Sequence, residues 1–138
     1  LRSVLIANPK GGAGKSTLAT NVAGHWATQG ARVMLGDIDR QQSARHWLGM
    51  RSPLLAPIST WELEPEQPAR PPRGTTHVVL DTPAGLRGKR LEAMLKMVDR
   101  VLIPVQPSIF DILATGDFLT ELAEHKRLCD RVATQLGR

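Results

Sequence analysis

Residues able to bind phosphate stand near the start of the chain, in the stretch Asn8-Pro9-Lys10-Gly11-Gly12-Ala13-Gly14-Lys15-Ser16-Thr17. The stretch fits the phosphate-binding pattern G-x-x-x-x-G-K-[ST] if Pro9 or Lys10 replaces the first glycine. Glycines adopt backbone conformations that side chains forbid, so main-chain N–H groups can close around an anion. Lys15 can neutralise phosphate oxygens, and the Ser16 hydroxyl can bind Mg²⁺. The stretch therefore predicts a phosphate-binding turn.

The flanking residues predict the strand and the helix that such a turn requires. Arg2–Ala7 is apolar without alternation, which is typical of a buried parallel strand. After the turn, Ser16–Gln29 places Leu18, Val22 and Trp26 on one face of a helix. The positive end of that helix would point at the bound anion. A glycine-rich turn that binds nothing is the weaker interpretation, because a motif of this length in this context seldom arises by accident.

Carboxylates follow two further predicted strands. Asp37 and Asp39 come after Arg32–Leu35, and Asp81 comes directly after His77–Leu80. Parallel sheets bind ligands at the carboxyl ends of their strands, so these side chains are expected beside the phosphate-binding turn, where they could serve a Mg²⁺ ion. Two alternatives stay open. Asp39 could simply cap the short helix predicted after it, and the residues after Asp81 could form an ordinary turn.

A fourth strand is predicted over Val101–Val105, with a helix after it. Ser108 can cap that helix, and Asp111 stands at the position of a capping box. The face expected toward the core comprises Ile112, Thr115, Leu119, Leu122 and Ala123.

Another helix begins with a basic cluster, Arg87, Lys89 and Arg90, and has an apolar face after it. Cations are unfavourable at the positive end of a helix, so the cluster indicates a role other than helix stability. A solvated charged face is an equally good interpretation.

Composition bounds the class of protein. The 138 residues are interpreted as one domain, in which residues 51–76 form a proline-rich surface connection. The net charge of +5 permits binding to nucleic acid but also suits a generally basic soluble protein. The single cysteine, Cys129, excludes an internal disulfide and favours a reducing cytoplasm. No apolar run approaches the roughly 20 residues that span a bilayer.

Four stretches resemble, in order and spacing, the ParA/MinD family of partition and positioning ATPases, and especially its small ParA-like members. They are Lys10–Thr17, Asp37–Gln41, Asp81–Gly85 and Pro104–Ser108. Lys10, ahead of the glycines, marks the deviant Walker-A (SIMIBI) class of P-loop NTPase. The resemblance implies an α/β fold, with helices on both faces of a parallel sheet and the phosphate-loop strand beside the third predicted strand. The family usually continues through another strand and helix, so we interpret the chain as a fragment or a shortened relative.

The resemblance also assigns roles to single residues. Lys10 would reach across a dimer to the partner's phosphates and would lack a partner in the monomer. Lys15 would grip the β- and γ-phosphates, and Asp39 would position the attacking water. The implied nucleotide-binding residues are Gly11, Gly12, Ala13, Gly14, Lys15, Ser16, Thr17, Gln106 and Pro107. The implied Mg²⁺ site comprises Ser16, Asp37 and Asp81.

Taken as a whole, the resemblance implies an ATPase switch that forms a homodimer with ATP and Mg²⁺ and then binds nonspecific DNA. Candidate DNA contacts are Lys126, Arg127 and Arg131. A ParB-like protein or a cargo adaptor would activate it, and it would act in the cytoplasm on the nucleoid, without a membrane. Two alternatives stay open. One is a nucleotide-gated binding module without significant turnover. The other is a metabolic P-loop synthetase or kinase, against which Lys10 argues.

Overall fold

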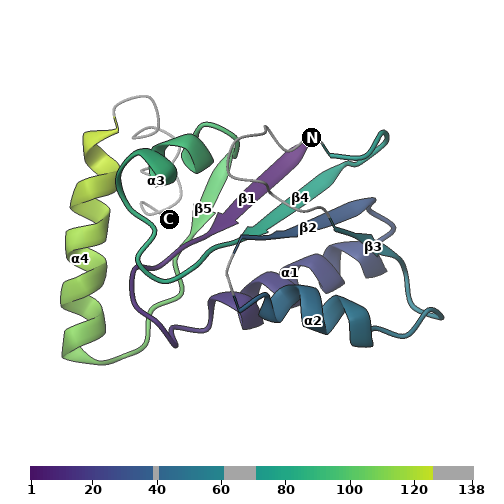
Figure 1. Cartoon of the computed structure of the whole chain (residues 1–138), viewed down its shortest axis with the longest axis horizontal. Coiled ribbons are helices and arrows are strands. Elements are labelled where there is room, and N and C mark those ends of the chain that lie inside the picture. The colour runs from purple at the N-terminus through teal and green to yellow at the C-terminus, as the bar shows by residue number, and fades with distance from the viewer. Residues whose placement is uncertain (39–40, 61–70, 126–138) are drawn as a thin grey trace.

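The computed structural model describes residues 1–38, 41–60 and 71–125. Within these ranges five strands form one parallel sheet in the order β3-β2-β4-β1-β5 (Figure 1). The strands are β1 (Arg2–Ile6), β2 (Val33–Asp37), β3 (Ile58–Ser59), β4 (His77–Asp81) and β5 (Arg100–Leu102). The helices are α1 (Lys15–Thr28), α2 (Ser43–Met50), α3 (Gly88–Leu95) and α4 (Ile109–Glu124). The predicted α/β fold is confirmed.

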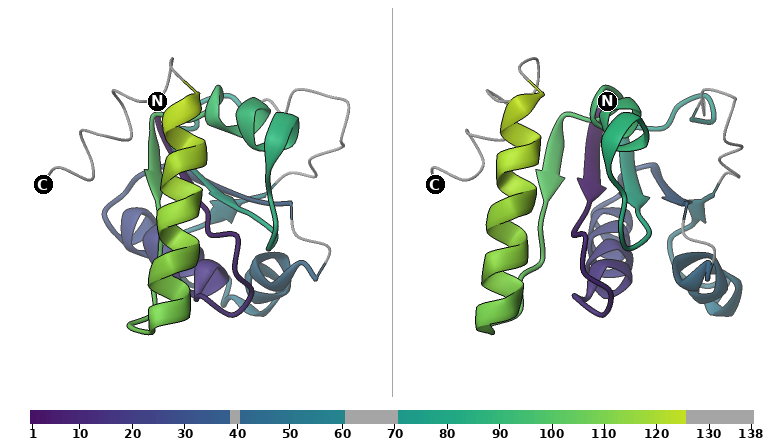
Figure 2. Two further views of the ribbon diagram at one scale, coloured as in Figure 1. Left: turned by 90° about the vertical axis from the view of Figure 1, so that its left-hand side faces the viewer. Right: turned by 60° about the vertical axis from the view of Figure 1, so that its left-hand side comes forward.

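Helices cover both faces of the sheet because the side chains of β1 alternate between two hydrophobic cores. Val4 and Ile6 belong to a core that α1 and α2 complete, whereas Leu5 belongs to the core of α3 and α4. Figure 1 shows α1 and α2 below the sheet, and Figure 2 shows α4 running lengthwise beside β5. No helix in the described part of the chain is long and apolar enough to cross a membrane.

The register of the strands gathers three carboxyl ends at one edge of the sheet. Ile6 of β1 pairs with Asp81 of β4, and Asp37 of β2 pairs with the same residue from the other side. The phosphate-binding stretch therefore starts next to the point where β4 ends. This adjacency was predicted, and it places the site at the edge where parallel sheets bind ligands.

The strand β5 is shorter than predicted. It ends at Leu102, so Val105 lies outside the sheet. Pro104 has no N–H to donate to a neighbouring strand, and its carbonyl accepts a hydrogen bond of 2.7 Å from the Asn8 Nδ2. The connection to α4 is thus attached to the phosphate-binding stretch by a side chain rather than by strand pairing.

Helix α4 is rotated relative to its predicted orientation. Ser108 caps it as predicted, since its Oγ accepts a hydrogen bond of 3.2 Å from the Asp111 N–H. The buried face comprises Asp111, Thr115, Phe118 and Leu122. The expectation that Ile112 and Ala123 face the core was wrong, because Ile112 is 54% exposed and Ala123 is exposed. Asp111 turns inward toward polar partners, and the opposite face of the helix is left apolar.

That exposed apolar surface, here called the α4 patch, consists of Val105, Ile109, Phe110, Ile112 and Leu113. Phe110 is the most exposed of them, at 75%. Single exposed apolar residues are ordinary, but neighbouring ones of this size often mark an interaction surface.

Candidate nucleotide-binding site

The phosphate-binding stretch forms a loop between β1 and α1. Gly12 and Gly14 have φ angles of 73° and 90°, in the left-handed region where a side chain would be strained. Gly14 is the N-cap of α1, and no side chain caps the helix. The first N–H groups of α1 and the positive end of its dipole are therefore available to an anion.

The side chain of Lys15 lies against this loop. Lys15 is the first residue of α1 and is only 7% exposed. Its Nζ donates a hydrogen bond of 2.8 Å to the carbonyl of Lys10, which folds the side chain back across the loop. The buried ammonium group therefore adds a full charge beside the N–H groups that would surround a phosphate.

A hydroxyl and a carboxylate meet at the base of the loop. The Ser16 Oγ donates a hydrogen bond of 2.6 Å to the Asp81 Oδ2, and Asp81 is 0% exposed. Both groups supply the hard oxygen ligands that Mg²⁺ prefers. No cluster of three or more His, Cys, Asp or Glu occurs in the residues that the structure describes. The donor set fits a Mg²⁺ ion that takes its other ligands from water and from nucleotide phosphates.

Lys10 has a partner within its own chain. Its Nζ lies 2.7 Å from the Asp111 Oδ1 at the start of α4, and its side chain is 42% exposed. The Ser108 hydroxyl donates to the other carboxylate oxygen of Asp111. The expectation that Lys10 is unpaired in a monomer was therefore wrong, because the inward turn of α4 brings a carboxylate to the loop.

Two amide side chains attach the loop to the segment between β5 and α4. Asn8 is 3% exposed and donates to the Pro104 carbonyl, while its Oδ1 accepts a hydrogen bond of 2.9 Å from the Lys10 N–H. The Gln106 Nε2 donates a hydrogen bond of 3.0 Å to the Gly12 carbonyl. Gln106 was predicted to lie at the nucleotide, whereas no separate role was predicted for Asn8. The place of Asn8, directly after the predicted buried strand and at the start of the loop, was the available signal.

The carboxylate of Asp37 bonds to the start of α2, a contact that was not predicted. Its Oδ2 accepts a hydrogen bond of 3.1 Å from the Arg45 N–H, in the first turn of α2. This contact stabilises the start of α2, which has no side-chain cap at Gln42. A role for Asp37 at the metal stays a prediction.

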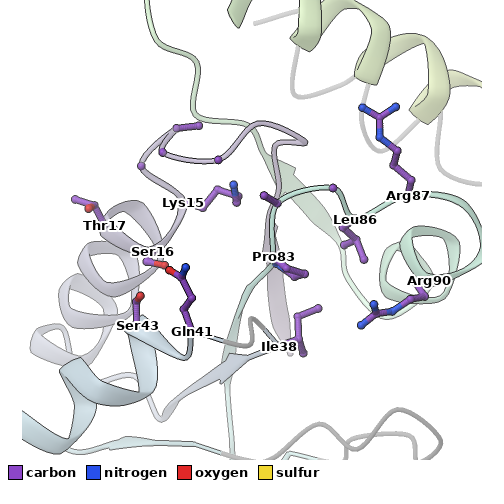
Figure 3. Close-up of a pocket in the computed structure, with 16 residues that line it drawn as sticks. Lys15, Ser16, Thr17, Ile38, Gln41, Ser43, Pro83, Leu86, Arg87 and Arg90 are labelled. Atoms are coloured by element: carbon purple, nitrogen blue, oxygen red, sulfur yellow. The ribbon is translucent and has the colours of Figure 1, made fainter.

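A cavity of about 820 Å³ lies against the loop (Figure 3). One wall is the loop, and the facing wall consists of residues 83–87 with Arg90. The two walls are joined where the Gly85 N–H donates a hydrogen bond of 3.0 Å to the Pro9 carbonyl. The lining residues include three cations and, among the described residues, no carboxylate; the cations are Lys15, Arg87 and Arg90. The cavity therefore suits a polyanionic ligand.

Apart from Lys10, Asp37 and Asp81, which are described above and do not line the cavity, the predicted site residues fall into three groups. Gly11–Thr17 line the cavity. Gln106 contacts the loop from outside, and Pro107 is exposed without lining the cavity. Four predicted residues lie outside the described part of the chain: Asp39, Lys126, Arg127 and Arg131.

Some lining residues were not assigned to the site beforehand. Gln41 lines the cavity just before α2, Ser43 is the first residue of α2, and Ile38 directly follows β2. Arg87 and Arg90 were recognised only as part of a basic cluster. Their position a few residues after Asp81-Thr82-Pro83-Ala84-Gly85 was the signal that could have placed them there.

Two features of this site define the fold of P-loop NTPases. A glycine-rich loop joins the first strand of a parallel sheet to the first helix, and the serine after it bonds to an acid on the neighbouring strand. Residues 4–135 match the family described as the CobQ/CobB/MinD/ParA nucleotide binding domain, CbiA. The chain belongs to this family, and its resemblance to ParA/MinD proteins is confirmed.

Three curated relatives illustrate the similarity. The "Maintenance of carboxysome distribution protein A" of Gloeobacter kilaueensis is 34% identical over 113 residues, which are 80% of this chain and 52% of the relative. The protein of the same name from Halothiobacillus neapolitanus is 33% identical over 132 residues, or 91% of this chain and 59% of the relative. The "Chromosome-partitioning ATPase Soj" of Thermus thermophilus is 33% identical over 110 residues, which are 79% of this chain and 34% of the relative. The chain thus spans about half the length of the first two relatives and a third of the last.

The ion pair at the start of α4 gives a prediction on stability. The hydrogen bond from Lys10, and then that from Ser108, holds the pKa of Asp111 below its usual value. A depressed pKa contributes stability above the usual aspartate value of about 3.9, and this contribution is lost as the pH falls through the folded-state pKa. We expect Asp111→Asn to unfold at lower urea than the parent at neutral pH.

That difference should shrink as the pH falls below about 4, because protonation then stabilises the unfolded parent and, at lower pH, removes the charge from the folded parent as well. Urea unfolding followed by circular dichroism across this range measures it. Asp117→Asn, which lies on the exposed side of the same helix, is the matched control. An equal loss for Asp111→Asn at all pH values would show that its charge contributes nothing.

Proposed function

We propose that this chain is an ATP-dependent switch, which binds ATP with Mg²⁺, dimerises in that state and separates after hydrolysis. The observation that carries the proposal is the constellation at the loop. Lys15 folds over the glycines, and Ser16 bonds to the buried Asp81, beside a cationic cavity. Triphosphate and Mg²⁺ together match this set of donors, acceptors and charges.

The proposed chemistry is phosphoryl transfer to water, which depends on positioning and charge rather than on a covalent intermediate. The loop N–H groups and Lys15 would hold the phosphates, and Ser16 with Asp81 would hold Mg²⁺. The metal, when bound, neutralises charge between the outer phosphates. Asp39, on the strength of the family resemblance, would orient the attacking water.

Dimerisation is supported by two features, one in the loop and one on α4. Lys10 is close to half exposed, so its amine could exchange Asp111 for a phosphate of a second subunit. Apart from Val105, the α4 patch lies on the outward face of the helix that carries Asp111, and it offers apolar side chains to a protein interface. ATP would favour association because the exchange gives Lys10 a more highly charged partner.

The cargo is proposed from the relatives and from charge. Curated relatives are described by name as acting in chromosome partitioning and in carboxysome distribution. With a net charge of +5, the ATP-bound dimer would bind nonspecific DNA on the nucleoid and respond to a ParB-like or cargo-adaptor activator. We place the role in the cytoplasm, in partition of DNA or positioning of another large cargo.

One set of measurements tests the proposed function: ATP hydrolysis with and without DNA, with molecular mass by light scattering in parallel. A slow hydrolysis that accompanies a shift from monomer to dimer supports the switch. Nucleotide binding without turnover would instead indicate a nucleotide-gated binding module. Rapid turnover only with a small-molecule acceptor would indicate a metabolic synthetase or kinase.

Binding to DNA should depend on salt and ignore sequence. Each phosphate neutralised by a lysine or arginine releases counterions, so log affinity should fall with log salt by a slope of roughly −0.9 per contact. We expect a triple variant, with Lys126, Arg127 and Arg131 changed to alanine, to bind more weakly and with a shallower slope. Fluorescence anisotropy with duplexes of two unrelated sequences measures both quantities. Undiminished binding by the variant would exclude these residues as the contacts.

A further inference from the structure

The cavity has a cationic wall that the loop motif does not explain. Arg90 lies in the first turn of α3 and lines the cavity opposite the phosphate-binding loop. Figure 3 shows its guanidinium group reaching toward Ile38 and Pro83, whereas Arg87 points away, toward α4. Of the two arginines, Arg90 is therefore the one whose charge faces the interior of the cavity.

Within the part of the chain that the structure describes, no acidic group is bonded to the Arg90 side chain. No ion pair or hydrogen bond joins the Arg90 side chain to any residue in the described ranges 1–38, 41–60 and 71–125. Two acids on α3 and α4 bond to other groups. Glu92 pairs with Lys96 at 2.9 Å, and the Glu121 Oε1 accepts the Gly88 N–H at 3.1 Å.

The backbone that carries Arg90 is fixed in place. The next residue, Leu91, is 0% exposed, and Leu86 and Leu95 pack into the same core. Helix α3 has no acidic residue in its first turn, so its dipole adds positive potential near the arginine. An arginine at this end of a helix is locally unfavourable, and an anion in the cavity would offset that cost.

The order of groups along the cavity indicates which anion this is. In a phosphate loop the lysine reaches the β- and γ-phosphates, and the serine hydroxyl serves the metal between them. Figure 3 shows Thr17 and Arg90 on opposite sides of Lys15. The family resemblance implies that Thr17 lies near the α-phosphate, so Arg90 would lie on the side of the terminal phosphate.

We propose that Arg90 is a specificity-determining residue, which contacts the terminal phosphate of a bound nucleoside triphosphate and makes the site prefer ATP to ADP. The inference rests on the proposed nucleotide binding. It adds a second cation, from outside the loop motif, on the wall that faces Lys15. Because ADP lacks the terminal phosphate, Arg90 should contribute little to its binding. Arginine suits this task, since its planar group can bond two phosphate oxygens at once.

The test compares the affinities of two ligands. Isothermal titration with Mg²⁺ gives dissociation constants for a non-hydrolysable ATP analogue and for ADP, in the parent and in variants. We expect Arg90→Ala to weaken analogue binding about tenfold, as for loss of one charge-assisted hydrogen bond, and to change ADP binding less than about twofold. Arg90→Lys should retain part of the preference, because it keeps the charge without the bidentate geometry.

Matched variants separate this effect from a general change of charge or fold. Lys89→Ala removes the neighbouring exposed cation, which does not line the cavity, and should alter neither affinity. Circular dichroism melts of the Arg90 variants should match the parent, since the side chain is exposed.

The outcomes distinguish this inference from the proposed function. If the parent binds both nucleotides but Arg90→Ala weakens them equally, or weakens neither, the role of Arg90 is wrong and nucleotide binding stands. If the parent binds neither nucleotide, both are wrong. A selective loss of affinity for the analogue, partly rescued in Arg90→Lys, supports the assignment.

Discussion

Lys15→Ala should raise the dissociation constant for ATP with Mg²⁺ by about a hundredfold or more, as expected for the loss of a charge-assisted contact to two phosphates. The side chain is 7% exposed and already lies across the loop, with its Nζ 2.8 Å from the Lys10 carbonyl. Because the side chain is already restricted, it loses little rotamer entropy when the nucleotide binds. Most of the free energy of its contact with the phosphates therefore contributes to affinity. ADP binding should weaken as well, because the lysine also reaches the β-phosphate.

Titration of ATP, with Mg²⁺ present, into the parent and the variant measures this loss. Lys89→Ala is a suitable control, since it removes a lysine outside the cavity. Because Lys15 also bonds to the loop backbone, a thermal melt must show that the variant is folded. Unchanged affinity in a folded Lys15→Ala protein would refute the assignment of the phosphate-binding loop.

Lys10→Ala should abolish the ATP-dependent dimer while changing ATP affinity less than about threefold, since its contact to phosphate forms only across two subunits. Within one chain its amine contacts Asp111, and Lys10 does not line the cavity. Asp39→Ala should do the opposite. It should bind ATP, accumulate as the dimer and lose hydrolysis by orders of magnitude, because orienting water affects turnover and not binding.

Size-exclusion chromatography with light scattering, together with phosphate release, follows both variants. Lys96→Ala is the control for Lys10, since it also removes a half-exposed lysine that pairs with a carboxylate, here that of Glu92. A Lys10→Ala protein that dimerises with ATP like the parent would exclude the proposed contact between subunits. An Asp39→Ala protein with parental hydrolysis would exclude that aspartate as the residue that orients water.

Local sequence was sufficient to predict the first strand, the loop and the first helix. The apolar run before Asn8 and the glycines up to Lys15 determine their own conformations. The meeting of Ser16 with Asp81 could also be anticipated, although the two residues are distant in sequence. Parallel strands end at a common edge, so an acid at the end of a neighbouring strand lies near the loop.

Contacts that depend on how the helices pack against the sheet could not be predicted from the local sequence. Helix α4 is apolar on more than one side, and periodicity cannot tell which side faces the core. The decision depends on Asp111, a polar residue buried because Lys10 and Ser108 bond to it. Likewise, the sequence identified Arg90 as basic but not as part of the cavity, because that depends on where α3 packs.

The position of β1 in the sheet has a consequence for synthesis on the ribosome. Arg2 pairs with His77 and Val4 pairs with Arg100, so the first strand lies between strands that are translated much later. Pairing of this kind requires long loops to close, which costs chain entropy before any stabilising contact forms. The loop that begins after β1 is therefore synthesised before β4 and β5 but gains a fixed geometry only after them. A nascent chain should acquire affinity for nucleotide only after Leu102 has left the exit tunnel, and until then the apolar β1 is a segment for chaperones to protect.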